Sequence, residues 1–130
     1  MKIRRFTSLD FELLQSWAKA NDVQVFDRGM LPSTTYLVEN EGRDMASLSL
    51  ITTNTDRAYL EYALGNPELK GAARREAFAY LVQYVEELAR GLGYKTLSCL
   101  SPNDSLGAYY TSLGYQANLP DLCLMLKELN

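Results

Sequence analysis

The sequence predicts an α/β (α+β) domain in which a mixed sheet carries helices on its faces. Three observations lead to this class. A long apolar stripe with helical spacing runs through residues 72–90, short strand-like segments lie before and after it, and glycine-rich or polar turns separate the segments. The predicted order is strand, helix, an optional short helix, three strands, helix, strand, helix and two closing strands.

The first predicted strand covers residues 2–6, and a helix follows over 7–22. Thr7 or Ser8 can cap this helix, and four apolar side chains fall on one of its faces: Leu9, Leu13, Leu14 and Trp17. The next segment, 21–33, reads as a loop or as a short second helix.

Three strands are predicted in the middle of the chain. Residues 34–40 and 44–53 are joined by the turn EGR, so we expect them to form a hairpin. Residues 57–64 form the third strand, after the turn NTD. Together they predict a run of neighbouring antiparallel strands.

The helix over 72–90 is the clearest element. Its apolar stripe consists of Phe78, Leu81, Val82, Val85, Leu88, Ala89 and Leu92, and Gly91 and Gly93 provide a stop. Residues 94–100 then predict a strand. A turn with Asn103 or Asp104 as cap precedes a short helix over 105–113, and residues 115–129 fit a closing pair of strands.

Length and charge limit the classes of function. The 130 residues suit one domain, 1–130. A net charge of −3 argues against non-specific binding to nucleic acid, which depends on lysine and arginine. No apolar run approaches the ~20 residues of a membrane span, and the first residues lack the apolar region of a secretory signal. We therefore expect a cytoplasmic protein without nucleic-acid or membrane partners.

The chain offers few residues for metal or thiol chemistry. It has no histidine, which excludes histidine bases and histidine metal sites. Cys99 and Cys123 are the only cysteines, and two cysteines do not make a structural zinc site. We expect no metal and two reduced, unbridged thiols.

The stretch NDSLGAYYTSLGY, residues 103–115, resembles a segment of the GNAT superfamily of N-acetyltransferases with the pattern Asn-x-x-Ala-x-x-x-Tyr-x-x-x-Gly-Phe. Asn103, Tyr110, Gly114 and Tyr115 match in register, and Leu106 stands where alanine is usual. The resemblance implies a mixed, mostly antiparallel sheet of six to seven strands with helices on both faces. It also implies acetyl-CoA as cosubstrate, with Asn103 among its ligands.

A second stretch, GNPELKGAARREA, resembles the pyrophosphate loop of the same family, in which Arg/Gln-x-x-Gly-x-Gly/Ala precedes a helix. Its match is degenerate, because neither register satisfies the whole motif. Counted from Pro67, the arginine position falls on Lys70 and the glycine positions fall on Ala73 and Arg75. Counted from Gly71, the arginine position falls on a glutamate. The resemblance implies that acetyl-CoA binds Lys70, Gly71, Ala72, Ala73, Arg74 and Arg75.

Arg74 and Arg75 open a helix, where the positive end of the helix dipole disfavours cations. Their position is favourable if a polyanion binds there, and the phosphates of coenzyme A would supply one. Alternatively, both side chains point to solvent or pair with Glu68 or Glu76.

Acetyl transfer needs a base for the amine, a polarised thioester and an acid for the leaving thiolate. Tyr110 matches the tyrosine that the family uses as acid, although it could simply pack its helix with Leu106 and Leu113. Without histidine, Glu61 is the best placed base, acting through water; alternatively it is solvated or paired across strands. The resemblance places thioester binding at the backbone of Ala63, Leu64 and Gly65, where Gly65 would allow a bulge.

These expectations combine into one function and one rival. The chain would move an acetyl group from acetyl-CoA to a primary amine of a small molecule or peptide, by direct attack. Three acids, Asp22, Asp27 and Asp56, could attract a cationic amine or be ordinary surface acids. The rival is a catalytically inactive GNAT-fold binding or regulatory module. Dimers are frequent in the family, so a homodimer is a weak expectation.

Overall fold

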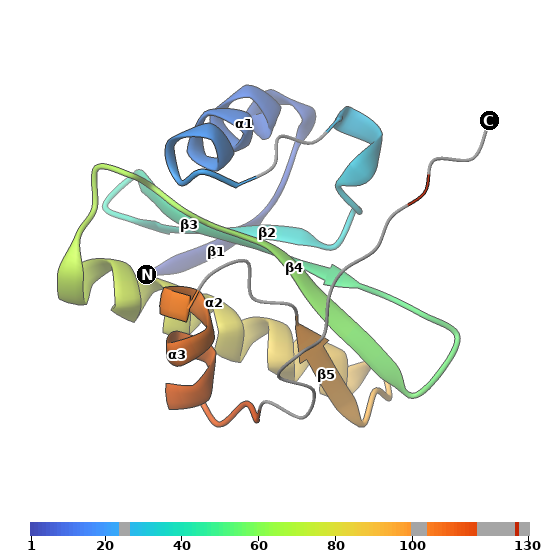
Figure 1. Cartoon of the computed structure of the whole chain (residues 1–130). Coiled ribbons are helices and arrows are strands. Elements are labelled where there is room, and N and C mark those ends of the chain that lie inside the picture. Colours follow the sequence, from blue (N-terminus) through green and yellow to red (C-terminus); the bar gives the residue numbers. More distant parts are fainter. Residues whose placement is uncertain (24–26, 100–103, 117–126, 128–130) are drawn as a thin grey trace. The chain divides into compact units, whose positions relative to one another are not determined.

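A computed structural model describes residues 1–23, 27–99, 104–116 and 127 of this chain (Figure 1). The chain divides into two compact units, 1–100 and 101–130. The prediction of a single domain over 1–130 therefore stays a prediction. Among the described residues, no helix is long and apolar enough to cross a membrane.

The first unit is built on a mixed, mostly antiparallel sheet, as predicted. Its strand order is β1-β2-β3-β4-β5, and every neighbouring pair is antiparallel except β4 and β5, which are parallel. The described part of the chain contains five strands, so six to seven strands are not confirmed. The closing pair predicted over 115–129 falls almost entirely outside the described residues. The strands are β1 Lys2–Arg5, β2 Thr35–Asn40, β3 Arg43–Ile51, β4 Arg57–Gly65 and β5 Thr96–Cys99.

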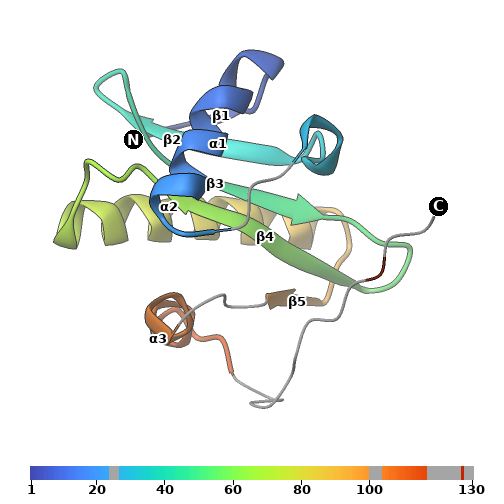
Figure 2. The same cartoon turned by 45° about the horizontal axis from the view of Figure 1, so that its top comes forward.

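Helices lie on both faces of this sheet, as Figures 1 and 2 show for α1 and α2. Helix α1, Phe11–Ala20, follows a short 3-10 helix, η1, at Ser8–Asp10. Its apolar side packs on one face of the sheet and forms a buried cluster with Leu37 of β2 and Leu64 of β4. The other members are Phe11, Leu14, Trp17, Ala18 and Leu31. A second 3-10 helix, η2, covers Arg28–Met30 in the segment predicted as loop or short helix.

Helix α2, Gly71–Gly91, covers the opposite face. There the rings of Tyr36 and Tyr84 meet edge to face with centroids 5.2 Å apart, and α2 packs against β2 and β3. The predicted apolar stripe is buried from Phe78 to Ala89 except at Leu88, which is half-buried; its fully buried members include Leu81, Val82 and Val85. Leu92 was wrongly included. It is 55% exposed because the helix ends before it, at a cap where Gly93 has φ +94°.

The start of the first predicted helix also needs correction. Residues 7–22 do not form one helix, since the 3-10 turn of η1 precedes α1. In that tighter turn Leu9 points outward and is 91% exposed, so its assignment to the buried face was wrong. Thr7 does precede the turn, as its cap.

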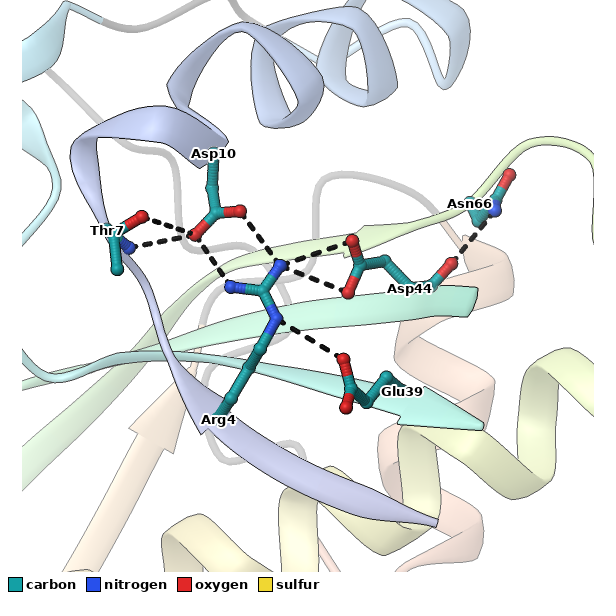
Figure 3. A network of polar contacts seen from close by, with 6 residues as sticks. All are labelled: Arg4, Thr7, Asp10, Glu39, Asp44 and Asn66. Carbon is teal, nitrogen blue, oxygen red and sulfur yellow. Dashed lines mark hydrogen bonds and ion pairs between the residues drawn. The ribbon is translucent and has the colours of Figure 1, made fainter. Parts of the chain in front are cut away.

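Polar contacts join the first three strands at one end of the sheet (Figure 3). The guanidinium of Arg4 on β1 donates to both carboxylate oxygens of Asp10 at 2.8 Å and to Asp44 on β3 at 3.1 Å. It also pairs with Glu39 on β2 at 3.5 Å. The hydrogen bonds to Asp10 and, to a smaller extent, Asp44 raise the pKa of Arg4, and they hold β1, η1 and β3 together.

We expect the fold to lose stability at acid pH through Asp10. Hydrogen bonds from Arg4 and from the Thr7 N–H hold the pKa of Asp10 below its ordinary value of 3.8. Its contribution is therefore complete above 3.8 and is lost as pH falls through the lower folded pKa. Urea unfolding of an Asp10→Asn variant checks this. The variant should be less stable than wild type near neutral pH, and the difference should shrink on acidification. Asp56→Asn, at an exposed acid, should parallel wild type; if Asp10→Asn does too, the assignment fails.

The second unit contains helix α3, Asp104–Ser112, close to the predicted 105–113. Gly114 closes the turn after the helix, as predicted: its φ is +98° and its N–H donates to the Thr111 carbonyl at 3.1 Å. The Tyr115 N–H donates to the Tyr110 carbonyl at 3.1 Å, which continues the helical turn past its last residue.

Candidate functional site

Strand β4 contains a β-bulge. Ser49 of β3 lies opposite Glu61, but Ser47 lies opposite Leu64, so β4 uses three residues where β3 uses two. Tyr62 absorbs the extra residue with φ +55°, a left-handed conformation that costs a non-glycine residue about 1–2 kcal/mol. The bulge is therefore centred on Tyr62, and Gly65, which we expected to permit it, has another role.

The bulge keeps Tyr62 on the side of α1. Its ring is partly buried against the cluster under α1. Burial, and to a smaller extent the charge of Glu61, raise the pKa of Tyr62. Sequence reasoning did not identify Tyr62, because no local signal marks a tyrosine with positive φ.

Among the described residues, the pairing of β4 with β5 extends to Leu60 and Cys99, and residue 100, the next on the β5 side, lies outside them. Strand β4 continues through Glu61–Gly65. In the described part of the chain, these five residues have no strand partner on the β5 side. This is the region where the thioester was predicted to bind, and that role stays a prediction. Cys99 is a free, half-buried thiol whose pKa burial raises, and Cys123 lies outside the described residues.

Glu61 is exposed on the face of the sheet that carries α1. Its cross-strand neighbour Ser49 is fully buried and shares a 2.8 Å hydrogen bond with Thr35 of β2. Within the described residues the Glu61 carboxylate forms no ion pair or hydrogen bond. Of the two alternatives to a base, a solvated carboxylate fits the described residues, and the paired one has no partner among them. Whether Glu61 acts as a base is still a prediction.

The turn after β4 is anchored to β3. The Asn66 side-chain amide donates to the Asp44 carbonyl at 2.9 Å (Figure 3), and its Oδ1 accepts the Glu68 N–H at 3.0 Å. Glu68 pairs with Arg43 at 2.8 Å. This exposed pair occupies Glu68, which was one of the predicted partners for the arginines of α2.

The first turn of α2 presents small residues and exposed backbone. Lys70 is the N-cap but its side chain makes no capping hydrogen bond, and the first turn contains no acid. Gly71 has φ +61° with open space beside it, and Ala72 and Ala73 are exposed. The leading N–H groups of a helix lack partners within the helix, and they favour an anion. Arg75 is also exposed at this end.

The side chain of Arg74 contacts other parts of the fold. Its guanidinium lies against Gly65 and donates to Oδ1 of Asn21, the residue that caps the C-terminus of α1. The Asn21 amide in turn donates to the carbonyls of Trp17 at 2.8 Å and Gly65 at 2.9 Å. Arg74 thus reaches the negative end of the α1 dipole, which favours a cation. An intramolecular partner therefore compensates its unfavourable place at the start of α2.

Gly65 provides the room for this contact. A Cβ at this position would lie 2.4 Å from Nε and 2.9 Å from Cζ of Arg74. We expect Gly65→Ala to displace the guanidinium and to lower the free energy of unfolding by about 1.5–3 kcal/mol, the contribution of a hydrogen bond to a charged group. Gly29→Ala, with open space beside it, is the matched control and should be neutral.

A double-mutant cycle decides whether Arg74 is the cause. In an Arg74→Ala background, Gly65→Ala should cost less than about 0.5 kcal/mol in a denaturant titration, because the displaced group is gone. An unchanged cost in that background would show that Gly65 acts through its backbone and not through Arg74.

The remaining predicted residues belong to the second unit. Tyr110 on α3 is only 4% exposed, and its ring centroid lies 5.3 Å from that of Tyr115. Leu106 and Leu113 are half-buried, so the packing alternative for Tyr110 is still open. Asn103 lies outside the described residues. The structure thus brings together the candidates on β4 and at the start of α2, while the role of Tyr110 stays a prediction.

No protein-family model matches the sequence, and no curated protein matches it. Solved structures do match. N-acetylglutamate synthase from Neisseria gonorrhoeae, solved with coenzyme A and L-arginine, is 20% identical with a TM-score of 0.74 over 92% of this chain. The chain spans only 29% of that enzyme's length.

Two shorter neighbours match over most of their own length. The ribosomal-protein-S18-alanine N-acetyltransferase from Escherichia coli is 16% identical with a TM-score of 0.69, over 87% of this chain and 76% of that chain. Ard1 from Thermoplasma volcanium is 14% identical with a TM-score of 0.74, over 91% and 84%. The chain therefore has the fold of the GNAT N-acetyltransferases, and that prediction is confirmed.

Proposed function

We propose that this protein is an N-acetyltransferase that moves an acetyl group from acetyl-CoA to a primary amine by direct attack. The observation that carries the proposal is the path along β4. Its described pairing with β5 extends to Leu60, a bulge follows at Tyr62, and the strand leads to the start of α2, where the Lys70 side chain makes no capping hydrogen bond. Coenzyme A is present in the N. gonorrhoeae neighbour, which supports the same class of cosubstrate here.

The start of α2 suits the pyrophosphate of the cosubstrate. Gly71, Ala72 and Ala73 leave its backbone N–H groups accessible, and Lys70 and Arg75 add positive charge. Arg74 could join them only by leaving Asn21. The backbone of Ala63, Leu64 and Gly65 would hold the thioester end, and Asn103 would complete the set of ligands.

Two side chains would handle the protons. Glu61 would accept a proton from the amine through water, because an alkyl amine with a pKa near ~10.4 must become neutral before it attacks. The amine nitrogen then forms a bond to the thioester carbonyl carbon, the carbon–sulfur bond breaks, and the nitrogen releases its surplus proton to water. Tyr110 would protonate the departing thiolate and regain a proton from water. No covalent intermediate with the protein is needed.

Titration calorimetry with CoA and acetyl-CoA tests the first step, and an acetylation assay on a panel of amines tests the second. We expect Arg75→Ala to weaken CoA binding about 10-fold, because a charge-assisted bond to phosphate contributes roughly 1.5–3 kcal/mol and 1.4 kcal/mol is one decade. Arg90→Ala, at the other end of the same helix, is the control and should bind normally. Wild-type protein that binds neither compound would rule out the transferase.

One observation favours a second candidate, the inactive binding or regulatory module. Arg75 stands at a position where the family motif has glycine, and Arg74 is engaged with Asn21. A protein that binds CoA but acetylates no amine in the panel would be this module.

A further inference from the structure

We propose that the acceptor is an amine that also carries a carboxylate, bound along the outer half of β4 by Arg57, Tyr59 and Glu61. This inference rests on the proposed function, and it names the substrate class of the same site. Glu61 would take the ammonium end next to the bulge, Arg57 would take the carboxylate, and the ring of Tyr59 would contact the chain between them.

The three side chains share one face of the sheet. Burial alternates along this part of β4: Ala58 and Leu60 are buried, whereas Arg57, Tyr59 and Glu61 are exposed. Successive residues of a strand point to opposite faces, so the exposed set forms one row.

Cross-strand pairing assigns that row to the α1 side. Glu61 lies opposite Ser49, and the Ser49 hydroxyl contacts Thr35, which is two residues before Leu37 in the cluster under α1. Tyr59 lies opposite Ile51 on the same face.

Helix α1 leaves this row uncovered. It packs near Leu64, at the far end of β4, and the outer end of the β3–β4 hairpin extends past it (Figures 1 and 2). Tyr59 keeps 39% of its surface exposed, although a tyrosine on a sheet face would ordinarily be covered. An aromatic ring beside charged groups is a common surface for small cationic ligands.

The charged groups at the two ends of the row have no hydrogen-bonding or ion-pair partner within the described part of the chain. Neither the Arg57 guanidinium nor the Glu61 carboxylate forms a hydrogen bond or ion pair with another described residue. Four residues of strand separate their Cα atoms by about 13 Å, too far for a direct pair unless both side chains bend inward. One cation and one anion at opposite ends of an aromatic ring complement a ligand with the opposite charges at its two ends.

The backbone at Arg57 is fixed by the turn before it. The carbonyl of Arg57 accepts the hydroxyls of Thr53 at 2.5 Å and Thr55 at 3.3 Å, and its N–H donates to the Thr55 hydroxyl at 3.2 Å. The side chain of Arg57 therefore starts from a constrained position at the outer end of the row, as a recognition residue should.

Three acceptors of equal chain length test the proposal with the 130-residue chain: 6-aminohexanoate, 6-aminohexan-1-ol and 1,6-diaminohexane. We expect wild type to acetylate 6-aminohexanoate with a kcat/KM at least ~10-fold above that for the alcohol, the factor that corresponds to 1.4 kcal/mol. Arg57→Gln should remove this preference for the carboxylate over the alcohol. Arg57→Glu should shift the preference to the diamine, and Arg90→Glu should shift nothing.

The outcomes separate this inference from the proposed function. If all three amines are acetylated at similar rates and Arg57→Glu does not alter their order, the transferase stands and the inference fails. If no amine is acetylated, the transferase fails, and binding of 6-aminohexanoate by saturation-transfer NMR decides the inference. Binding that Arg57→Glu abolishes supports it, and binding that is absent or unaffected by Arg57→Glu overturns it.

Discussion

Phe78→Ala should lower the free energy of unfolding by about 3–5 kcal/mol in a denaturant titration. Phe78 is 8% exposed on the buried side of α2, and α2 packs against the two central strands β2 and β3. Truncation removes apolar contacts and leaves a cavity that the helix and sheet cannot close completely.

The control for this prediction lies five residues further along the same helix, on its exposed face. Gln83 is exposed, so Gln83→Ala should change stability by no more than about 0.5 kcal/mol. Equal stabilities of the two variants would mean that the face of α2 assigned to the core is wrong.

Local periodicity explains why this helix could be predicted. The apolar residues of α2 recur at helical spacing over about three turns, and burial of one face is the dominant force on such a segment. Gly93 could be predicted as a stop because its left-handed cap requires no partner from elsewhere in the chain. Leu92 follows the same period but belongs to the cap, which periodicity alone does not reveal.

Contacts between distant residues explain what could not be predicted. The sequence suggested that Gly65 gives the chain freedom to bulge, but in the structure Gly65 gives room to the guanidinium of Arg74. The partner of Arg74, Asn21, lies 53 residues away at the end of another helix. An asparagine at the predicted end of a helix is a typical capping residue, yet its second role depends on tertiary packing.

The position of the bulge within β4 could not be predicted from the local sequence either. Glycine is the residue that most easily adopts positive φ, so the sequence pointed to Gly65. The fold places the positive φ at Tyr62 instead, because Leu64 and the Tyr62 ring both pack toward α1. Pairing with β3 therefore decides where β4 bulges, and it also sets the face on which Glu61 is exposed.

Glu61→Gln should reduce the rate of acetyl transfer by about 10²–10⁴-fold, the usual contribution of a general base. The affinity for CoA should not change, because the carboxylate lies on the exposed face of β4 and not at the start of α2. The free energy of unfolding should stay within about 0.5 kcal/mol of wild type, since Glu61 forms no ion pair among the described residues. Glu87→Gln, at an exposed acid on α2, is the control and should be fully active.

The pH dependence of this deficit distinguishes a base from a residue that only binds the amine. Below ~10.4 an alkyl amine is mostly protonated, and wild type benefits from a group that accepts its proton. As pH approaches that value the amine loses the proton without help, so the rate of Glu61→Gln should approach that of wild type. A deficit of the same size at every pH would mean that Glu61 attracts the ammonium without accepting its proton. Full activity of the variant at neutral pH would remove Glu61 from the mechanism and leave water as the base.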